Sequence, residues 1–197
     1  MANSIKDKKL LYHLTSLENI DLILKDGLCS RNSSKQFVDV GEPDIIKFRE
    51  EKGLNDYIPF HFFCGNPFDG AVLKSKTHSD KDFIYICIYR DNAKKENFKI
   101  IPMHPNSMKP LQLYDYSEGF DLIEWDKMEL RDYSDQKCKH ICMAECLSQK
   151  TIPSNQFFCI YVQNKKVQSD VSSKYREIHE QNPSFHINVN SDMLKRD

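Results

Sequence analysis

The alternation of apolar and polar positions along the chain predicts a protein built from both strands and helices. Residues 82–89 (DFIYICIY) form the clearest strand, because apolar residues on both faces indicate a central position in a sheet. The apolar run 156–162 predicts a second buried strand. The aromatic run 57–63 predicts an edge strand or a strand start, because it contains Pro59. The remaining predicted strands are residues 10–15 and 185–189.

Helical periodicity is present in three segments. In the first, apolar residues recur at helical spacing over 17–24, directly after a Thr15-x-x-Glu18 sequence that has the form of a capping box. Gly27 is placed to end this helix in a left-handed conformation. The other two predicted helices are residues 43–53, with a proline in the first turn, and residues 165–180.

Length and composition favour one compact domain over residues 1–197. Hydrophobic residues make up 40% and charged residues 29% of the 197 positions, which excludes a disordered chain and a fibrous repeat. Because strands and helices are intermixed, the predicted fold class is α/β (α+β), a single domain with a mixed central sheet. Three predicted loops are long enough to carry function: 64–80, 91–120 and 131–140.

Composition also excludes three classes of protein. No apolar run approaches the roughly 18–20 residues of a membrane span, so no membrane partner is expected. The run Leu10-Leu11-Tyr12 is too short for a signal-peptide core, so a cytoplasmic protein is expected. With 28 Lys+Arg against 29 Asp+Glu and a net charge of −1, the chain does not bind polyanions over its whole surface. A local basic groove remains compatible with this balance.

The cysteines favour reduced, buried thiols over a metal site. Their number, seven, is odd, and the chain shows no secretory segment. Cys138, Cys142 and Cys146 follow at intervals of four. On one helix they would share a face but span about 12 Å at a rise of 1.5 Å per residue, too far to meet at one ion. We therefore expect no metal.

Pattern alone leaves three scattered candidates for chemistry, because no Walker loop, dinucleotide fingerprint, zinc-protease motif or nucleophile elbow occurs. His13 lies between apolar neighbours on a strand, which favours a core histidine. Arg49 on a predicted helix favours a solvated surface arginine. Glu145 lies within the apolar sequence ICMAECL, where a carboxylate is either exposed at a polar edge or desolvated and functional. The pattern does not decide between these two.

Five short motifs, however, follow one another in an order and spacing that resemble a known family. They are residues 12–15 with 18–28, 40–49 ending in Arg49, 54–62, 120–133, and 143–147 around Glu145. Together they resemble the DarT family, NAD-dependent ADP-ribosyltransferase toxins that modify bases in DNA. The resemblance covers roughly residues 10–190.

This resemblance implies an ADP-ribosyltransferase-like fold, NAD as co-substrate, and two catalytic residues. Glu145 would stabilise the oxocarbenium-like state that forms when the bond between nicotinamide and ribose breaks. Arg49 would bind the NAD pyrophosphate or stabilise an ionising base, because a guanidinium stays protonated. The other residues expected at NAD are His13, Leu14 and Thr15 on the first strand and Phe60 and Phe62, which would pack the nicotinamide.

The implied acceptor is a base of single-stranded DNA, where base edges are exposed without flipping. RNA as acceptor, and a non-enzymatic nucleic-acid-binding module of the same fold, remain as alternatives. For the acceptor strand we expect a local groove in which lysines hold phosphates while an aromatic ring stacks on a base. Its predicted residues are Lys74, Lys76, Lys81 and Phe68. A monomer is expected, and the family implies a macrodomain antitoxin as partner.

Overall fold

The computed structural model describes residues 4–34, 36–78 and 82–195, and a seven-stranded sheet lies at its centre. The strands are arranged in the order β4-β5-β2-β1-β3-β6-β7. Neighbouring strands are antiparallel except β6 and β7, which are parallel, so the predicted mixed central sheet is confirmed. The strands are β1 (Leu10–Ser16), β2 (Ile58–His61), β3 (Phe83–Tyr89), β4 (Lys99–Ile101), β5 (Glu145–Ser148), β6 (Cys159–Val162) and β7 (His186–Val189).

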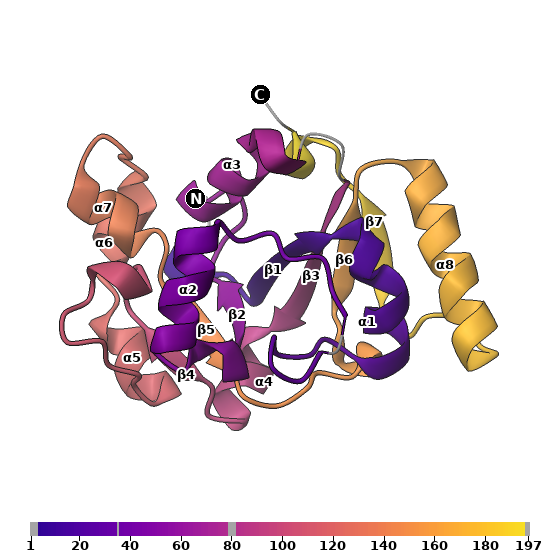
Figure 1. The fold of residues 1–197 in the computed structure, drawn as a ribbon, viewed down its shortest axis with the longest axis horizontal. Helices are drawn as coiled ribbons and strands as arrows, with labels where there is room; N and C mark the ends of the chain where they lie inside the picture. Colours follow the sequence, from indigo (N-terminus) through magenta and orange to yellow (C-terminus); the bar gives the residue numbers. More distant parts are fainter. Residues whose placement is uncertain (1–3, 35, 79–81, 196–197) are drawn as a thin grey trace.

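Helices gather at both ends of the sheet (Figure 1). One group, α5 to α7, lies beside β4 and β5, and α1 and α8 pack together beside β6 and β7. None of the helices within the described residues is long and apolar enough to cross a bilayer. The helices are α1 (Ile20–Asp26), α2 (Pro43–Glu51), α3 (Pro67–Lys74), α4 (Arg90–Lys95), α5 (Tyr116–Leu122), α6 (Trp125–Leu130), α7 (Gln136–Ile141) and α8 (Lys165–His179).

The N-terminal cap of the first predicted helix differs from the predicted capping box. A short 3-10 turn precedes α1, and the Ser16 side chain accepts the backbone N–H of Glu18 there. Thr15 instead accepts a hydrogen bond from the buried Asn19 side chain, so the predicted Thr15–Glu18 capping box is wrong. Gly27 ends α1 as predicted, with φ 86°, and a Cβ at this position would lie 2.7 Å from a backbone oxygen of Ile152.

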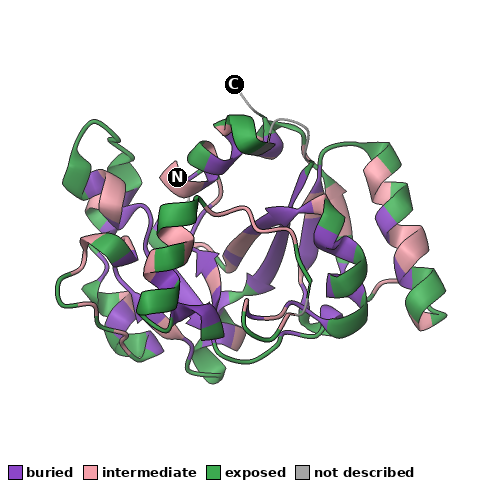
Figure 2. Cartoon of the chain, viewed as in Figure 1, coloured by how far each residue is buried: buried purple, intermediate pink, exposed green. Residues whose placement is uncertain are grey.

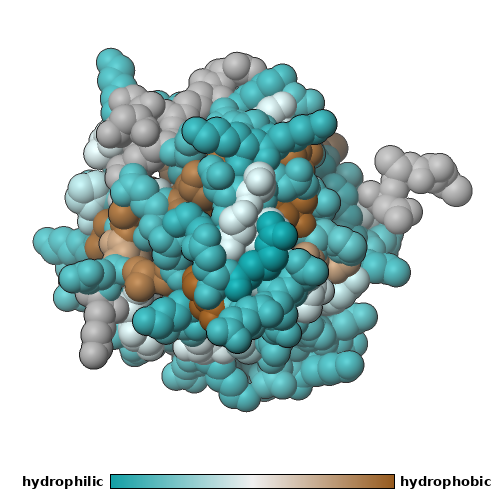
Figure 3. All heavy atoms as spheres, turned by 90° about the vertical axis from the view of Figure 1, so that its right-hand side faces the viewer, coloured by the Kyte–Doolittle hydropathy of each residue, from teal (hydrophilic) through white to brown (hydrophobic). Residues whose placement is uncertain are grey.

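The amphipathic α8 matches the predicted surface helix. It buries Val171 and Tyr175 against the sheet side, while its outer residues are mostly exposed (Figure 2). The side of the molecule that carries α8 is mainly hydrophilic, with hydrophobic residues in small separate patches (Figure 3). The α8 face therefore offers no broad apolar surface.

Two hydrophobic clusters pack on opposite faces of the sheet, and β3 contributes to both. Ile84, Ile86 and Ile88 belong to the larger cluster, which also contains residues of α1 and α8. The intervening residues of β3 belong to the smaller cluster, which packs against α3. Burial on both faces explains why the central position of β3 is visible in its uninterrupted apolar sequence.

Several segments differ from the predicted elements. The predicted loop 64–80 contains α3, which the Asn66 side chain caps together with Asp69. The predicted loop 91–120 contains β4, most of α4 and most of α5, and the predicted loop 131–140 contains most of α7. The segment with three evenly spaced cysteines is not one helix, because α7 ends at Ile141 and β5 begins at Glu145. All four residues of β5 are buried, so the strand has no alternation for a pattern to detect.

Candidate active site

The site lies where β1 and β2 separate. β1 pairs with β3 at seven register positions but with β2 at a single one, Tyr12 opposite His61. A cavity of about 670 Å³ is present there, a volume typical of small-molecule sites. It is lined by His13, Leu14 and Thr15 of β1, by Pro59 and His61 of β2, and by parts of α1, α2, α3 and the loop after α1.

Pro59 explains how two neighbouring strands can part. Of the two predicted alternatives, the strand start is correct, because β2 begins at Ile58, whereas the edge strand is wrong, because β2 lies between β5 and β1. On the β1 side, however, Pro59 has no N–H to leave unpaired, and its carbonyl accepts a hydrogen bond from His13 Nδ1 at 2.7 Å. A side chain of β1 therefore replaces the missing backbone ladder, and the opening carries no unpaired backbone group at this residue.

Glu145 and Arg49 form a buried ion pair at the cavity. Glu145, the first residue of β5, is 7% exposed, and Arg49 of α2 is 6% exposed. Arg49 Nη1 donates to both carboxylate oxygens, at 2.9 Å and 2.8 Å. The solvated arginine that the pattern favoured is thus wrong, and of the two alternatives for Glu145 the desolvated one is correct.

The position of this ion pair allows it to interact electrostatically with a group in the cavity. Both side chains line the cavity, and the guanidinium fixes the orientation of the carboxylate there. Arg49 also approaches the backbone oxygen of Leu54 through Nη2, at 3.5 Å. Removing one partner of a buried ion pair leaves an uncompensated charge, which costs about 3–5 kcal/mol of stability.

His13 lies at the cavity as predicted, in the neutral form. Because the Pro59 carbonyl only accepts, Nδ1 carries the proton and Nε2 keeps its lone pair. Burial, with smaller contributions from the nearby His61 and Arg49, lowers the pKa of His13 to about 4 against the raising effect of the Pro59 hydrogen bond. The imidazole therefore offers a polar, uncharged contact at neutral pH.

The lowered pKa of His13 predicts a pH-dependent stability. Between pH 6.5 and about pH 4 the unfolded chain binds a proton at this residue that the folded protein does not, so the free energy of unfolding falls as the pH falls. In urea denaturation, His13→Gln should lose less stability over this interval than the wild type. The exposed His186 provides a control, since His186→Gln should follow the wild type. Equal losses in His13→Gln and the wild type would contradict a half-buried, neutral His13 with a lowered pKa.

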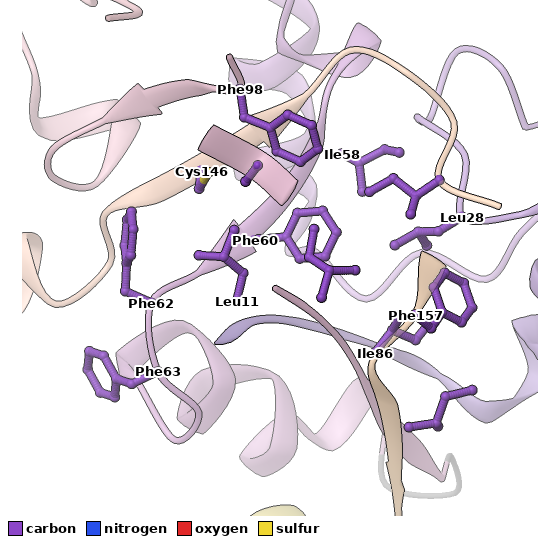
Figure 4. Close-up of a cluster of buried hydrophobic side chains, with 14 of the residues drawn as sticks. Leu11, Leu28, Ile58, Phe60, Phe62, Phe63, Ile86, Phe98, Cys146 and Phe157 are labelled. Carbon is purple, nitrogen blue, oxygen red and sulfur yellow. The ribbon is translucent and has the colours of Figure 1, made fainter. Parts of the chain in front are cut away.

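The prediction that Phe60 and Phe62 contact NAD is wrong. Phe60 is 0% and Phe62 1% exposed, and both point into the larger hydrophobic cluster (Figure 4). Side chains alternate along a strand, so the face of β2 opposite these rings carries Pro59 and His61, and those two line the cavity. His61 is the residue that sequence reasoning missed, although the same alternation could have identified it.

The loop after α1 forms another wall of the cavity. Asn19 holds it through two hydrogen bonds with the backbone of Val38, at 2.9 Å and 2.7 Å. Arg31 pairs with Asp39 at 2.6 Å and donates to Asn55 at 2.7 Å, which ties the loop to the segment after α2. Sequence analysis assigned no role to these side chains, because their partners are distant along the chain.

The residues predicted for the acceptor strand lie in different places. Phe68 of α3 lines the cavity, with its ring centroid 5.4 Å from that of His61. Lys74 and Lys76 are exposed farther along the same segment and do not line the cavity, and Lys81 lies outside the described residues.

The predicted loops 64–80 and 131–140 do lie side by side. Tyr133 donates to the backbone oxygen of Gly65 at 3.4 Å, and the Arg131 guanidinium lies 5.0 Å from the centroid of the Phe63 ring. Arg131 and Tyr133 are both exposed. Exposed aromatic and basic side chains of 131–140 therefore lie against the segment before α3, but they do not line the cavity.

A family model matches residues 12–194, and its description is ssDNA thymidine ADP-ribosyltransferase, DarT. The chain belongs to the DarT family. By family it is an NAD-dependent ADP-ribosyltransferase that acts on thymidine in single-stranded DNA. The sequence motifs predicted transfer to a base of single-stranded DNA, and the family description specifies which base. No curated protein sequence matches the chain.

Solved structures of DarT proteins share this fold. A Thermus sp. 2.9 DarT in complex with ADP-ribosylated ssDNA is 18% identical with a TM-score of 0.82, covering 99% of this chain and 100% of that one. The same protein with NAD⁺ is 16% identical with a TM-score of 0.75, at 95% and 98% coverage. Thermosipho africanus DarTG with ADP-ribose is 16% identical with a TM-score of 0.69, and the match spans 95% of this chain and 51% of that chain. The ADP-ribosyltransferase-like fold predicted from the motifs is thereby confirmed.

The described residues offer no site for a metal ion. Within that part of the chain, no group of three or more His, Cys, Asp or Glu side chains is arranged to hold one. The candidate site therefore consists of the cavity, the buried Glu145–Arg49 pair and the histidines around it.

Proposed function

We propose that the cavity between β1 and β2 binds NAD and that Glu145 and Arg49 carry out transfer of ADP-ribose to thymidine in single-stranded DNA. The buried pair of these two residues at the opening of the sheet carries this proposal. The family membership supports it, and so does the structure of the Thermus relative in complex with NAD⁺.

In this reaction the bond between nicotinamide and ribose breaks, and its electron pair leaves with the nicotinamide. The ribose carbon becomes electron-poor, as in glycoside cleavage. Glu145 stabilises that charge, because its carboxylate is fixed and desolvated before the reaction begins. Arg49 compensates the charge of the carboxylate and orients it, and its remaining N–H groups are available to a phosphate or to an ionising base.

The first strand supplies contacts to NAD beside the catalytic pair. His13 presents a neutral ring with one free nitrogen, and Thr15 presents a hydroxyl whose oxygen accepts from Asn19. Such groups hydrogen-bond ribose hydroxyls and amides without adding charge. Leu14 lines the cavity with them.

The acceptor base enters beside α3, where Phe68 offers a stacking surface next to His61. A single strand suits this entrance, because its bases reach a cavity without the few kcal/mol that flipping from a duplex requires. With a net charge of −1, phosphate contacts must come from local side chains. Lys74, Lys76 and Lys81 remain our proposal for them.

Neutralising Lys74 and Lys76 together should weaken binding of single-stranded oligonucleotides. If both contact phosphates, the salt slope of log K should flatten by up to about 1.4, or about 0.7 for each lost contact. Titrations at several salt concentrations measure this slope. The matched control neutralises Lys165 and Lys166, which are exposed at the start of α8, and should leave the slope unchanged. An unaltered slope in the α3 variant would remove this surface from the proposal.

We further propose that the enzyme acts as a monomeric, cytoplasmic toxin countered by a macrodomain antitoxin. The resemblance noted in the sequence and the DarTG name of the Thermosipho relative support the antitoxin. Expression of the wild-type gene should arrest growth, and co-expression of a macrodomain that removes the modification should relieve the arrest. Light scattering on the purified protein tests the monomer.

Incubation with labelled NAD and three acceptors tests the choice of substrate. We expect label on single-stranded DNA and much less on the matching duplex or on RNA of the same sequence. Preferential labelling of RNA would establish the alternative acceptor. Absence of transfer to every nucleic acid, with retained DNA binding, would instead favour the non-enzymatic module.

A further inference from the structure

The transfer reaction must remove a proton from the acceptor base. Thymine in a nucleoside carries a single N–H, at N3. Whichever atom of the base forms the new bond, the product is neutral only if this N3 proton is lost. Arg49 is a poor acceptor, because a guanidinium stays protonated and donates here to both oxygens of Glu145. Glu145 would lose its stabilising charge by accepting the proton. Another base is therefore needed near the acceptor.

His61 has the position of such a base. It lies directly opposite Glu145 in the β2–β5 ladder, so the two side chains are neighbours on the same face of the sheet. His61 is 6% exposed and lines the cavity. Its ring lies beside Phe68, with the centroids 5.4 Å apart, where the proposed stacking surface for the base is.

The tautomer of His61 also fits this role. Nδ1 lies 3.1 Å from the backbone oxygen of Ala144, which can only accept, so Nδ1 carries the proton. Among the described residues Nε2 has no hydrogen-bond partner. The ring is thus held by one nitrogen and keeps a lone pair on the other, which is how an oriented general base is built.

A carboxylate lies near His61, where it can stabilise the imidazolium that forms when the ring accepts a proton. Asp69 of α3 is buried, and its Oδ1 has no hydrogen-bond partner within the described residues, whereas Oδ2 accepts from Tyr85 and Gly65. Burial raises the pKa of Asp69, and the imidazole of His61 acts on it in the opposite direction. The other titratable or charged groups around His61 are His13 of β1, Arg49 of α2, Glu145 of β5 and His104 after β4.

Two other histidines at the cavity fit less well. Burial lowers the pKa of His13 to about 4, so this ring is a weak base. It lies on β1 and donates a hydrogen bond to Pro59 of β2. Burial also lowers the pKa of His104, whose ring centroid lies 6.2 Å from that of His140. Neither of these histidines lies both opposite Glu145 in the β2–β5 ladder and beside the Phe68 ring.

We propose that His61 is a third catalytic residue, which accepts the N3 proton of thymine through Nε2 as ADP-ribose is transferred. This inference rests on the proposed function. As the ribose–nicotinamide bond breaks, its electron pair neutralises the leaving nicotinamide, and an electron pair of the base forms the new bond to the ribose carbon. The N3–H bond breaks, its electrons remain on the base, and the proton passes to His61 and then to water. Asp69 acts as a positioning residue that stabilises the imidazolium.

The test compares two acceptors in one oligonucleotide, thymidine and its 5-trifluoromethyl analogue, whose N3–H is more acidic. His61→Gln can still donate to the Ala144 oxygen but has no basic nitrogen. On thymidine it should reduce single-turnover transfer about 10²–10⁴-fold, the usual contribution of a general base. On the acidic analogue the loss should be at least about tenfold smaller, since less basicity is needed. His186→Gln, on exposed β7, is the matched control and should behave as wild type.

A second variant guards against misfolding of the first. In His61→Ala, added imidazole should restore transfer to thymidine in proportion to its concentration. Wild-type rates in His61→Gln, or equal losses on both acceptors together with no rescue by imidazole, would overturn the assignment of His61. Failure of the wild-type protein to label DNA at all would instead overturn the proposed function, so the two failures are distinguishable.

Discussion

Glu145→Gln should reduce transfer of ADP-ribose to single-stranded DNA at least about 10²–10³-fold, the usual effect of removing one preorganised stabilising group. Glutamine retains the shape of the side chain and one acceptor oxygen for Arg49 but lacks the charge that opposes the developing cation. Release of nicotinamide from NAD should fall with it, because bond cleavage itself is slowed. Single-turnover assays of labelled DNA and free nicotinamide measure both rates.

A double variant separates this chemical effect from stability. Glu145→Gln alone leaves the buried Arg49 guanidinium without its counter-charge, so its melting temperature should drop. Adding Arg49→Met replaces the ion pair by uncharged side chains and should recover much of that stability, since such exchanges are often neutral. Activity should stay lost in the double variant. Recovery of activity together with stability would show that Glu145 only supports the fold.

Arg49→Lys should reduce transfer nearly as strongly as Arg49→Ala, although the lysine keeps the positive charge. In the structure one guanidinium nitrogen contacts both oxygens of Glu145 while the second approaches the Leu54 carbonyl. An ammonium group cannot span these acceptors, so the carboxylate loses its fixed orientation. We expect a loss of at least about 100-fold, in the range of removing a transition-state contact.

Stability distinguishes the two Arg49 variants. Arg49→Ala should lower the free energy of unfolding by about 3–5 kcal/mol, because it leaves a buried carboxylate unpaired, whereas Arg49→Lys should lower it by much less. Urea denaturation of both proteins measures the difference. Near-wild-type transfer by Arg49→Lys would show that a diffuse positive charge is sufficient and that the two-nitrogen geometry of the guanidinium plays no part.

The sequence predicted Glu145 and Arg49 as site residues only through the order of its motifs. Pattern alone favoured a solvated Arg49 and left Glu145 undecided, because the two residues lie 96 positions apart and only the packing of α2 beside β5 brings them together. The roles of Phe60 and Phe62 were wrong for a related reason. Two aromatic rings on one face of a strand are equally compatible with a ligand and with a hydrophobic core, and the other elements of the fold decide which one they meet.

Most long elements were predictable, and the short or fully buried ones were not. The uninterrupted apolar sequence of β3 and the polar periodicity of α8 identify both elements. β4 has three residues and β5 four, all buried or nearly so, and neither has a period that single-sequence reasoning can detect. A hydrogen bond between His13 and Pro59 connects β1 and β2 where they separate, and no local sequence signal indicates such a contact.

Mass spectrometry of a single-stranded oligonucleotide containing one thymidine tests the central claim most directly. After incubation with NAD and the wild-type protein, we predict that the oligonucleotide gains one ADP-ribose unit, located on that thymidine, with release of one nicotinamide for each strand modified. The same reaction with Glu145→Gln should leave the oligonucleotide unmodified. An unmodified strand with the wild-type protein, or equal modification by the Glu145→Gln protein, would contradict the account.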